Sequence, residues 1–288
     1  MNRVFEYLYA LCDLFMPRAC LACGCRLGMR ERHLCLACAA DVPYTRYWLQ
    51  AHNPLADRFN AVLERHRGTE RMDYAYAVAL MHYKGNYRAI PRALKYHADL
   101  AAGRFFGALL GRRIAAAPHF TDIDLVIPVP LHWTRRRSRG YNQSAILARA
   151  LVDAFGESVI LGLTGNLPLP TCRTDLLIRA RRTKTQTRLS VEQKARNVSS
   201  AFRVPERFPL WKRICFPHFG LNLFPHSGLA PESPATVLAS ARHILLVDDT
   251  FTTGATLYAC YAALRPYTTA RISVATLSAV EGTPSLGP

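Results

Sequence analysis

Residues 246–256 constrain the fold of this chain more than any other segment. They continue an apolar run from His243 that is typical of a buried strand, and this run closes on the adjacent carboxylates Asp248 and Asp249. Threonines and one glycine follow, and an apolar helix is expected from about Ala255. A strand that passes through a short polar turn into a helix is typical of α/β proteins, which bind ligands at the carboxyl ends of parallel strands.

Strands and helices alternate along the chain from Tyr74 onward. The expected strands are 74–83, 124–130, 243–248 and 270–277, and the expected helices are 87–117, 142–155 and 255–264. This alternation predicts an α/β fold with a parallel sheet and crossover helices on both of its faces. Residues 42–54 show little periodicity, and we interpret them as a connector.

The turn after the two carboxylates predicts an anion-binding site. Hydroxyl groups and open backbone N–H groups would gather there at a helix N-terminus, where anions bind. The residues that supply them are Thr252, Thr253, Gly254 and Thr256. Ionised Asp248 and Asp249 only accept hydrogen bonds, which suits a sugar diol or a hydrated Mg²⁺. The chain has neither a Gly-x-Gly-x-x-Gly nor a Gly-Lys-Ser/Thr motif, so the pattern favours a phosphorylated sugar, with an ordinary strand–turn–helix as the alternative.

Four of the nine cysteines form two closely spaced Cys-x-x-Cys pairs. They are Cys20, Cys23, Cys35 and Cys38. Two such pairs predict a zinc ribbon, in which each pair supplies two thiolates to one tetrahedral Zn²⁺. A disulfide framework fits less well, because we expect no cleaved signal peptide and a reducing compartment. Cys25 and His33 lie close enough in sequence to replace one of the four ligands, so the ligand set stays open.

We expect two domains. Residues 1–50 would hold an N-terminal helix and the zinc ribbon, and residues 51–288 would hold the parallel sheet. A stretch rich in proline and aromatic residues, at about 205–236, is interpreted as an insert before the last sheet strands. No apolar run approaches the roughly 18 residues that a membrane-spanning helix needs, so we expect no membrane span and a cytoplasmic protein.

The net charge of +17 arises mainly from arginine, whose guanidinium group pairs with phosphate oxygens. The excess concentrates in residues 131–200. The arginines that we single out for contact with pyrophosphate or DNA are Arg135, Arg136, Arg137 and Arg139. With Trp133, Tyr141 and Tyr47 available for stacking, this band predicts binding to single-stranded DNA. The alternative is that these arginines form a solvated charged face, or that they supply the positive charge that a phosphate-binding cleft needs in any case.

Residues 246–256 resemble the phosphoribosyl-pyrophosphate (PRPP) loop of type I phosphoribosyltransferases, and further motifs narrow the resemblance to the competence protein ComF family. These motifs are the two cysteine pairs, Tyr83-Lys-Gly, Val-Pro-Leu-His-Trp-Thr-Arg-Arg-Arg-Ser-Arg-Gly-Tyr-Asn-Gln at 129–143, Arg-Arg-Thr-Lys-Thr-Gln at 181–186, and Arg196-Asn197. They extend over nearly the whole chain and are specific in combination. The chain departs from the pattern at Phe251, where aliphatic residues are usual.

The resemblance implies a type I phosphoribosyltransferase-like sheet preceded by a small zinc ribbon, with PRPP and Mg²⁺ bound in the cleft. The PRPP-binding residues that it implies are Asp248, Asp249, Thr250, Thr252, Thr253, Gly254, Ala255 and Thr256. The two aspartates would hold the ribose hydroxyls and residues 252–256 the 5-phosphate. The turn after Pro128 would meet pyrophosphate, and residues 135–141 and 181–186 would flank the cleft.

Three functions remain open. The resemblance favours a PRPP-binding protein that acts in DNA uptake during natural competence, with DNA, a DNA-uptake helicase or other competence proteins as partners. The first alternative is a non-catalytic adaptor for single-stranded DNA with a vestigial cleft, and the second is a phosphoribosyltransferase that salvages nucleobases. If the chain is catalytic it is a glycosyltransferase, but no motif identifies the acceptor or a catalytic residue.

Overall fold

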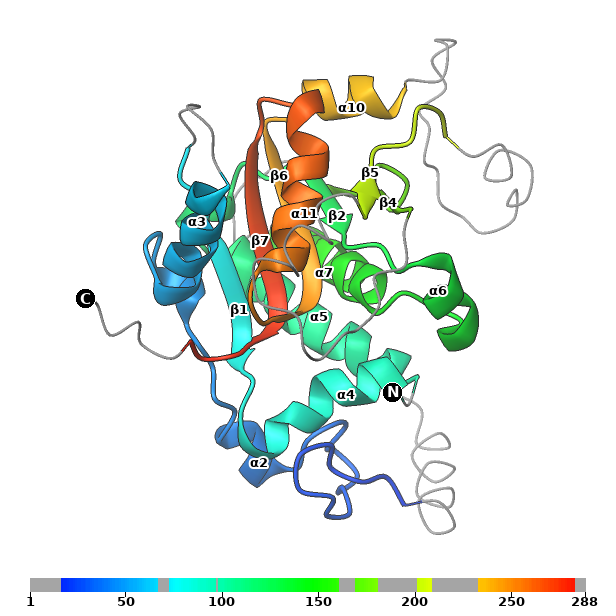
Figure 1. The fold of residues 1–288 in the computed structure, drawn as a ribbon. Coiled ribbons are helices and arrows are strands. Elements are labelled where there is room, and N and C mark those ends of the chain that lie inside the picture. Colours follow the sequence, from blue (N-terminus) through cyan, green and yellow to red (C-terminus); the bar gives the residue numbers. More distant parts are fainter. Residues whose placement is uncertain are drawn as a thin grey trace.

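The computed structural model describes residues 17–66, 73–96, 98–160, 169–180, 201–208 and 233–282. A five-stranded parallel sheet with the order β1-β7-β6-β2-β3 forms its centre (Figure 1). The strands are β1 (Ala77–His82), β2 (Leu125–Pro128), β3 (Thr171–Cys172), β6 (His243–Phe251) and β7 (Arg271–Ala279). A separate antiparallel pair consists of β4 (Ile178–Arg179) and β5 (Phe202–Arg203). The predicted α/β architecture is confirmed.

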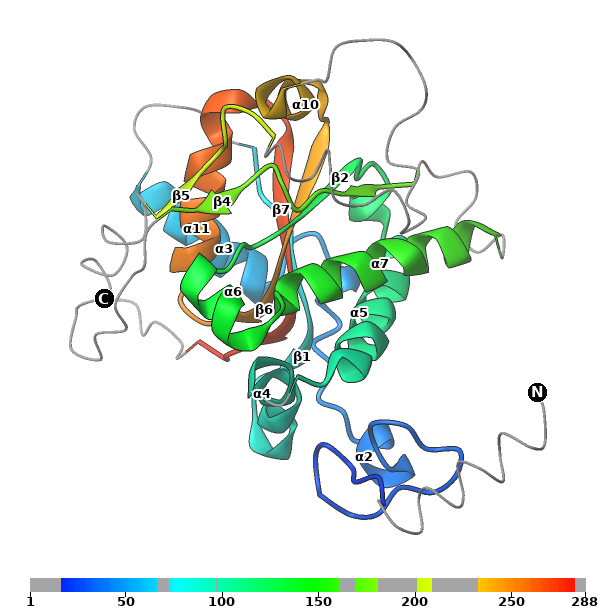
Figure 2. The ribbon, with the colours of Figure 1, turned by 90° about the vertical axis from the view of Figure 1, so that its right-hand side faces the viewer.

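Helices cover both faces of the sheet (Figure 2). On one face lie α3 (Pro54–Arg65) and α11 (Ala255–Leu264), and on the other lie α5 (Leu100–Ala115) and α7 (Gln143–Ile160). The shorter helices are α2 (Leu36–Ala40), α4 (Ala89–Tyr96), α6 (Trp133–Arg139) and α10 (Pro234–Ser240). Among the helices described, none is both long and apolar enough to cross a bilayer.

The central strand β6 joins two apolar layers. Ile244 and Leu246 pack in the layer formed with α3 and α11, whereas Leu245 and Val247 pack in the layer formed with α5 and α7. All four side chains are fully buried. This is the pattern of a parallel strand covered on both faces, in which successive side chains point to opposite sides.

Two sequence expectations need correction, and three others lie wholly or mostly outside the described residues. The expected helix 87–117 is wrong as a single element: it is divided into α4 and α5, because Ala98 adopts a left-handed φ of 51° and Asp99 caps α5. The expected strand 243–248 continues to Phe251, because β7 also runs further and pairs with it there. The N-terminal helix, most of the 205–236 insert and the 181–197 motifs lie outside the described residues.

Helix α3 was not predicted, although its start has clear signals. Asn53 accepts hydrogen bonds from the backbone N–H groups of Leu55 and Ala56, and Pro54 occupies the first turn. Leu55 and Phe59 are fully buried at helical spacing in the layer against β1. The expected connector 42–54 therefore leads directly into a core helix.

A buried polar network fastens the amino ends of β6 and β7. His243, the first residue of β6, is fully buried, and its Nδ1 lies 2.6 Å from Asp122 Oδ1. Its Nε2 lies 2.8 Å from the Oγ of Ser273 in β7. Burial lowers the pKa of His243 although Asp122 opposes the shift, so we assign a neutral imidazole that donates to Asp122 and accepts from Ser273.

Helices α5 and α7 pack unusually close together, because glycines of α5 face the backbone of α7. A Cβ atom added at Gly111 would lie 2.5 Å from the carbonyl oxygen of Leu151, and one at Gly107 would lie 2.8 Å from that of Leu147. Both separations are too short for non-bonded atoms, so any side chain there would force the helices apart.

We expect Gly111→Ala to lower the free energy of unfolding by about 1–3 kcal/mol, the usual cost of overpacking a core. Helix propensity alone would favour alanine by up to about 1 kcal/mol. Gly156→Ala in α7 is the control, since the nearest atom to its added Cβ, Leu169 Cδ2, is 4.0 Å away. Urea unfolding followed by circular dichroism measures both variants, and equal stability would contradict the close packing.

Candidate functional site

The two adjacent carboxylates lie inside β6, near its carboxyl end, and have different neighbours. The Oγ of Ser144, in the first turn of α7, donates a hydrogen bond of 2.9 Å to Asp248 Oδ1. Asp249 is buried, and its Oδ2 lies 2.8 Å from the ammonium nitrogen of Lys95 at the end of α4. The nearest polar partner thus differs between the two carboxylates: it is a hydroxyl for Asp248 and an ammonium group for Asp249.

The pKa of Asp248 is raised to about 7. Burial is the main cause and the charge of Asp249 is the second, while hydrogen bonding and the charge of Lys95 counteract them. Near neutral pH this carboxyl group therefore takes up or releases a proton readily. Hydroxyl donors or a cation beside it would stabilise the ionised form.

The turn between β6 and α11 is very short. Only Thr252, Thr253 and Gly254 separate the last residue of the strand from Ala255, the first residue of the helix. Gly254 adopts a left-handed φ of 79°, and a Cβ there would also lie 3.0 Å from the ring of Phe251, so both conformation and space require glycine. The N-terminus of α11 follows this turn, and the N–H of its first residue, Ala255, donates to the Oγ1 of Thr253 at 3.4 Å.

Arg58 of α3 holds the turn between β6 and α11 in place. Its guanidinium donates to the carbonyl oxygens of Thr252 at 2.7 Å and of Val280 at 2.6 Å. It also lies over the ring of Phe251, 5.2 Å from the centroid, and that ring meets Phe59 edge to face. Phe251, the departure from the family pattern, is therefore a core residue that supports the turn.

The predicted arginines lie on α6, directly after the carboxyl end of β2. Arg135, Arg136 and Arg137 are exposed, and the Arg139 guanidinium lies 5.5 Å from the ring centroid of Tyr96 in α4. Trp133 is 64% exposed on the same helix. The structure therefore brings an exposed indole and a row of guanidinium groups together beside the end of the sheet.

The other two predicted stacking residues serve the fold instead. The hydroxyl of Tyr141 donates to the carbonyl oxygen of Leu94, which ties the start of α7 to α4. Tyr47 packs against the core layer of α3 and meets His82 edge to face. Neither ring is an open platform in this structure.

Lys95, Arg58 and Arg179 are site residues that the sequence analysis missed. Arg179 of β4 lies over the ring of Phe202, 5.2 Å from the centroid. Burial and the nearby Arg135 lower the pKa of Arg179, whereas Asp248 raises it. The electrostatic surroundings of Arg179 therefore include both α6 and Asp248. The capping signal at Asn53 predicts a helix that contains Arg58, but no local sequence pattern marks Lys95 or Arg179.

The four predicted cysteines lie together, with their Sγ atoms all within 4.8 Å of one another. Four thiolates at these separations could hold one metal ion. His33 is not in this group, since its ring packs 5.1 Å from that of Phe105 on α5. Cys25 remains beside the group, with its Sγ 3.3 Å from that of Cys23.

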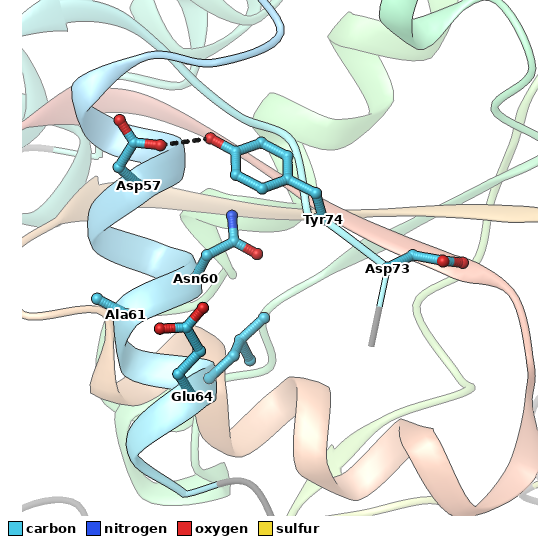
Figure 3. A pocket seen from close by; sticks show the side chains of 7 residues that line it. Asp57, Asn60, Ala61, Glu64, Asp73 and Tyr74 are labelled. Carbon is cyan, nitrogen blue, oxygen red and sulfur yellow. Dashed lines mark hydrogen bonds between the residues drawn. The ribbon is translucent and has the colours of Figure 1, made fainter. Parts of the chain in front are cut away.

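A hollow of about 330 Å³ lies along α3 and is acidic. Asp57, Glu64 and Asp73 line it, and the hydroxyl of Tyr74 donates to Asp57 at 2.7 Å (Figure 3). Three carboxylates without a basic side chain in the lining repel phosphate. This hollow is therefore not a candidate for the sugar-phosphate site.

No family model matches the chain. Among curated proteins it is similar to Competence protein F of Haemophilus influenzae, with 23% identity over 249 residues, 84% of this chain and 89% of that protein. The similarity thus covers most of both proteins, and the motifs that carry the resemblance extend over nearly the whole of this chain. On this basis the chain is ComF-like.

Proposed function

We propose that this ComF-like chain binds PRPP with Mg²⁺ at the carboxyl end of β6 and acts in DNA uptake during natural competence. The observation that carries the proposal is the order of two carboxylates, the last two residues of β6, a three-residue turn and the N-terminus of α11 at the ligand-binding edge of a parallel sheet. The competence assignment rests on the name of the similar Haemophilus influenzae protein. Transfer of the phosphoribosyl group would need an acceptor, and the proposal is limited to binding.

The chemistry of the site suits a sugar phosphate. The 5-phosphate would accept hydrogen bonds from the N–H groups and hydroxyls of residues 252–256 at the start of α11, where the helix dipole also favours an anion. Asp248 and Asp249 would accept hydrogen bonds from the ribose hydroxyls. The exposed arginines of α6 follow β2, the strand that pairs with β6, and they would be the groups that contact pyrophosphate.

Mg²⁺ fits the donor set, because it prefers carboxylate oxygens together with phosphate oxygens and water. Bound with PRPP, it would neutralise pyrophosphate charge. The residues that would hold it are Asp248 and Asp249. The raised pKa of Asp248 supports this assignment, since a carboxyl group that is crowded by a second one gains most from a nearby cation.

Calorimetric titration with PRPP and Mg²⁺ tests the proposal. We expect the wild type to bind and Asp248→Asn/Asp249→Asn to lose at least about 100-fold in affinity, because each amide also brings donors where only acceptors fit. Asp57→Asn/Asp73→Asn, on the acidic hollow, is a control with the same charge change. Equal binding by all three proteins would contradict the site, and a nucleobase that consumes PRPP would instead indicate a salvage enzyme.

We also propose that the cysteine cluster binds a structural Zn²⁺ through Cys20, Cys23, Cys35 and Cys38. Cys20 and Cys35 are buried in the apolar layer that continues to α4 and α5, so the metal would brace the ribbon against the sheet. The hydroxyl of Tyr87 donates to the carbonyl oxygen of Cys38 at 2.9 Å and adds a second link.

Metal analysis of the purified protein tests this set of ligands. We expect one zinc per chain in the wild type, loss of zinc in Cys35→Ser, and unchanged zinc in Cys25→Ser, since Cys25 lies outside the group of four. Chelation should lower the thermal midpoint of the wild type and of Cys25→Ser, and should leave that of Cys35→Ser unchanged. Zinc loss in Cys25→Ser would show that this thiol is a ligand.

Single-stranded DNA binding by α6 is a second candidate function, and exposed Trp133 beside three exposed arginines is the observation that favours it. Guanidinium groups neutralise phosphates while an indole stacks on a base. Trp133 and Tyr96 are both largely exposed, which leaves two rings open to bases.

Fluorescence anisotropy with labelled oligothymidine tests this second function. We expect Arg136→Gln/Arg137→Gln to weaken binding about tenfold or more and to reduce its salt dependence, because fewer phosphates are neutralised. Arg65→Gln/Arg104→Gln, two exposed arginines on other helices, is the control for net charge. Equal weakening by both variants would mean that DNA responds to overall charge and not to α6.

A further inference from the structure

Lys95 forms the closest ion pair of the candidate site, and the proposed function gives it no role. Its ammonium nitrogen is 2.8 Å from Asp249 Oδ2, and the two side chains are 28% and 7% exposed. By contrast, Lys84 pairs with Glu281 at 3.7 Å where both side chains are largely exposed. A pair as sheltered as Lys95 with Asp249 is weakly screened by salt, and removing one partner would leave a buried charge without compensation.

The position of Lys95 is fixed by its neighbours. The preceding residue, Leu94, is buried, and its carbonyl oxygen accepts the hydroxyl of Tyr141 from the segment before α7. Ala98, with its left-handed φ of 51°, ends the α4 region and begins the turn to α5. The backbone of Lys95 is therefore held at the end of α4, and its ammonium group meets Asp249 at the end of a long side chain that can still turn.

We propose that Lys95 is a selectivity residue, which keeps free divalent cations away from Asp249 and admits metal only as part of an anionic metal–polyphosphate complex. This inference rests on the proposed function. A free dication would have to displace an ammonium group already paired with the carboxylate, against its repulsion. A complex of Mg²⁺ with PRPP carries net negative charge, so it attracts the same ammonium group.

The ammonium group would then exchange partners. On arrival of the complex, Lys95 turns from Asp249 toward the phosphate oxygens, and the freed carboxylate faces the cation and the ribose hydroxyls. No charge is left uncompensated at any stage, because each departing partner is replaced by another of the same sign. Lysine suits this exchange, since its ammonium is a compact point charge on a flexible stem.

Two titrations with opposite expected signs test the proposal. In the first, free Mn²⁺ is the probe and electron paramagnetic resonance counts the unbound ion; in the second, calorimetry follows PRPP with Mg²⁺. We expect Lys95→Met to bind free Mn²⁺ about tenfold more tightly than the wild type and to bind PRPP with Mg²⁺ about tenfold more weakly, through one charge lost in a sheltered site. Lys84→Met, the control for net charge, should leave both affinities within about twofold.

Further variants identify the cause. Lys95→Arg keeps the charge and should restore the exclusion of free Mn²⁺, and Asp249→Asn added to Lys95→Met should abolish the gain in Mn²⁺ binding. A purely structural role of Lys95 would weaken both titrations together. Weaker binding of Lys95→Met in both titrations would overturn the inference. So would an affinity of Lys95→Met for Mn²⁺ equal to that of Lys84→Met.

The Mn²⁺ titration needs no PRPP, so the two proposals fail separately. If the wild type does not bind PRPP with Mg²⁺, the proposed function fails and admission of the complex fails with it. Exclusion of free metal by Lys95 is then judged by the Mn²⁺ titration alone.

Discussion

The parallel pairing of β6 between β2 and β7 is the interaction on which the rest of the structure depends. It buries Leu245, Leu246 and Val247 between two helical layers, and the pairing with β7 alone continues past the two aspartates to Phe251. The acidic residues are therefore part of the ladder and not of a loop. Their backbone is held in the sheet, so the other groups of the site are brought to them by the surrounding helices.

Four helices bring these other groups to β6. The start of α7 provides Ser144, the end of α4 provides Lys95, α3 provides Arg58, and α11 provides its N-terminus. Each helix is fixed by the core below it, so the carboxylates meet a hydroxyl on one side and an ammonium on the other without a ligand. A site that is organised in this way has less conformational freedom to lose when a ligand binds.

The sequence was sufficient where local patterns decide the structure. The helix expected at 255–264 is α11 with the same bounds, and the paired cysteine motifs identified the four thiols that lie together. Other features depend on contacts between distant segments. Strand β6 passes Asp248 because β7 runs beside it, and Lys95 meets Asp249 only after α4 has packed on the sheet. Spacing cannot show such contacts, whereas the capping signal at Asn53 was present and was overlooked.

The buried imidazole of His243 makes the amino end of β6 sensitive to pH, and the raised pKa of Asp248 makes the carboxyl end sensitive to pH as well. In the unfolded chain His243 would take up a proton once the pH falls below about 6.5, but the folded chain keeps it neutral, so each pH unit below that point weakens the fold by up to about 1.4 kcal/mol. At the carboxyl end, the pKa of Asp248 is raised to about 7, so near pH 7 this carboxyl group is ionised in only part of the molecules. The two ends of β6 therefore respond to pH in opposite ways: a rise toward neutral pH strengthens the anchor at His243, whereas it ionises Asp248 in its buried site at a cost to stability.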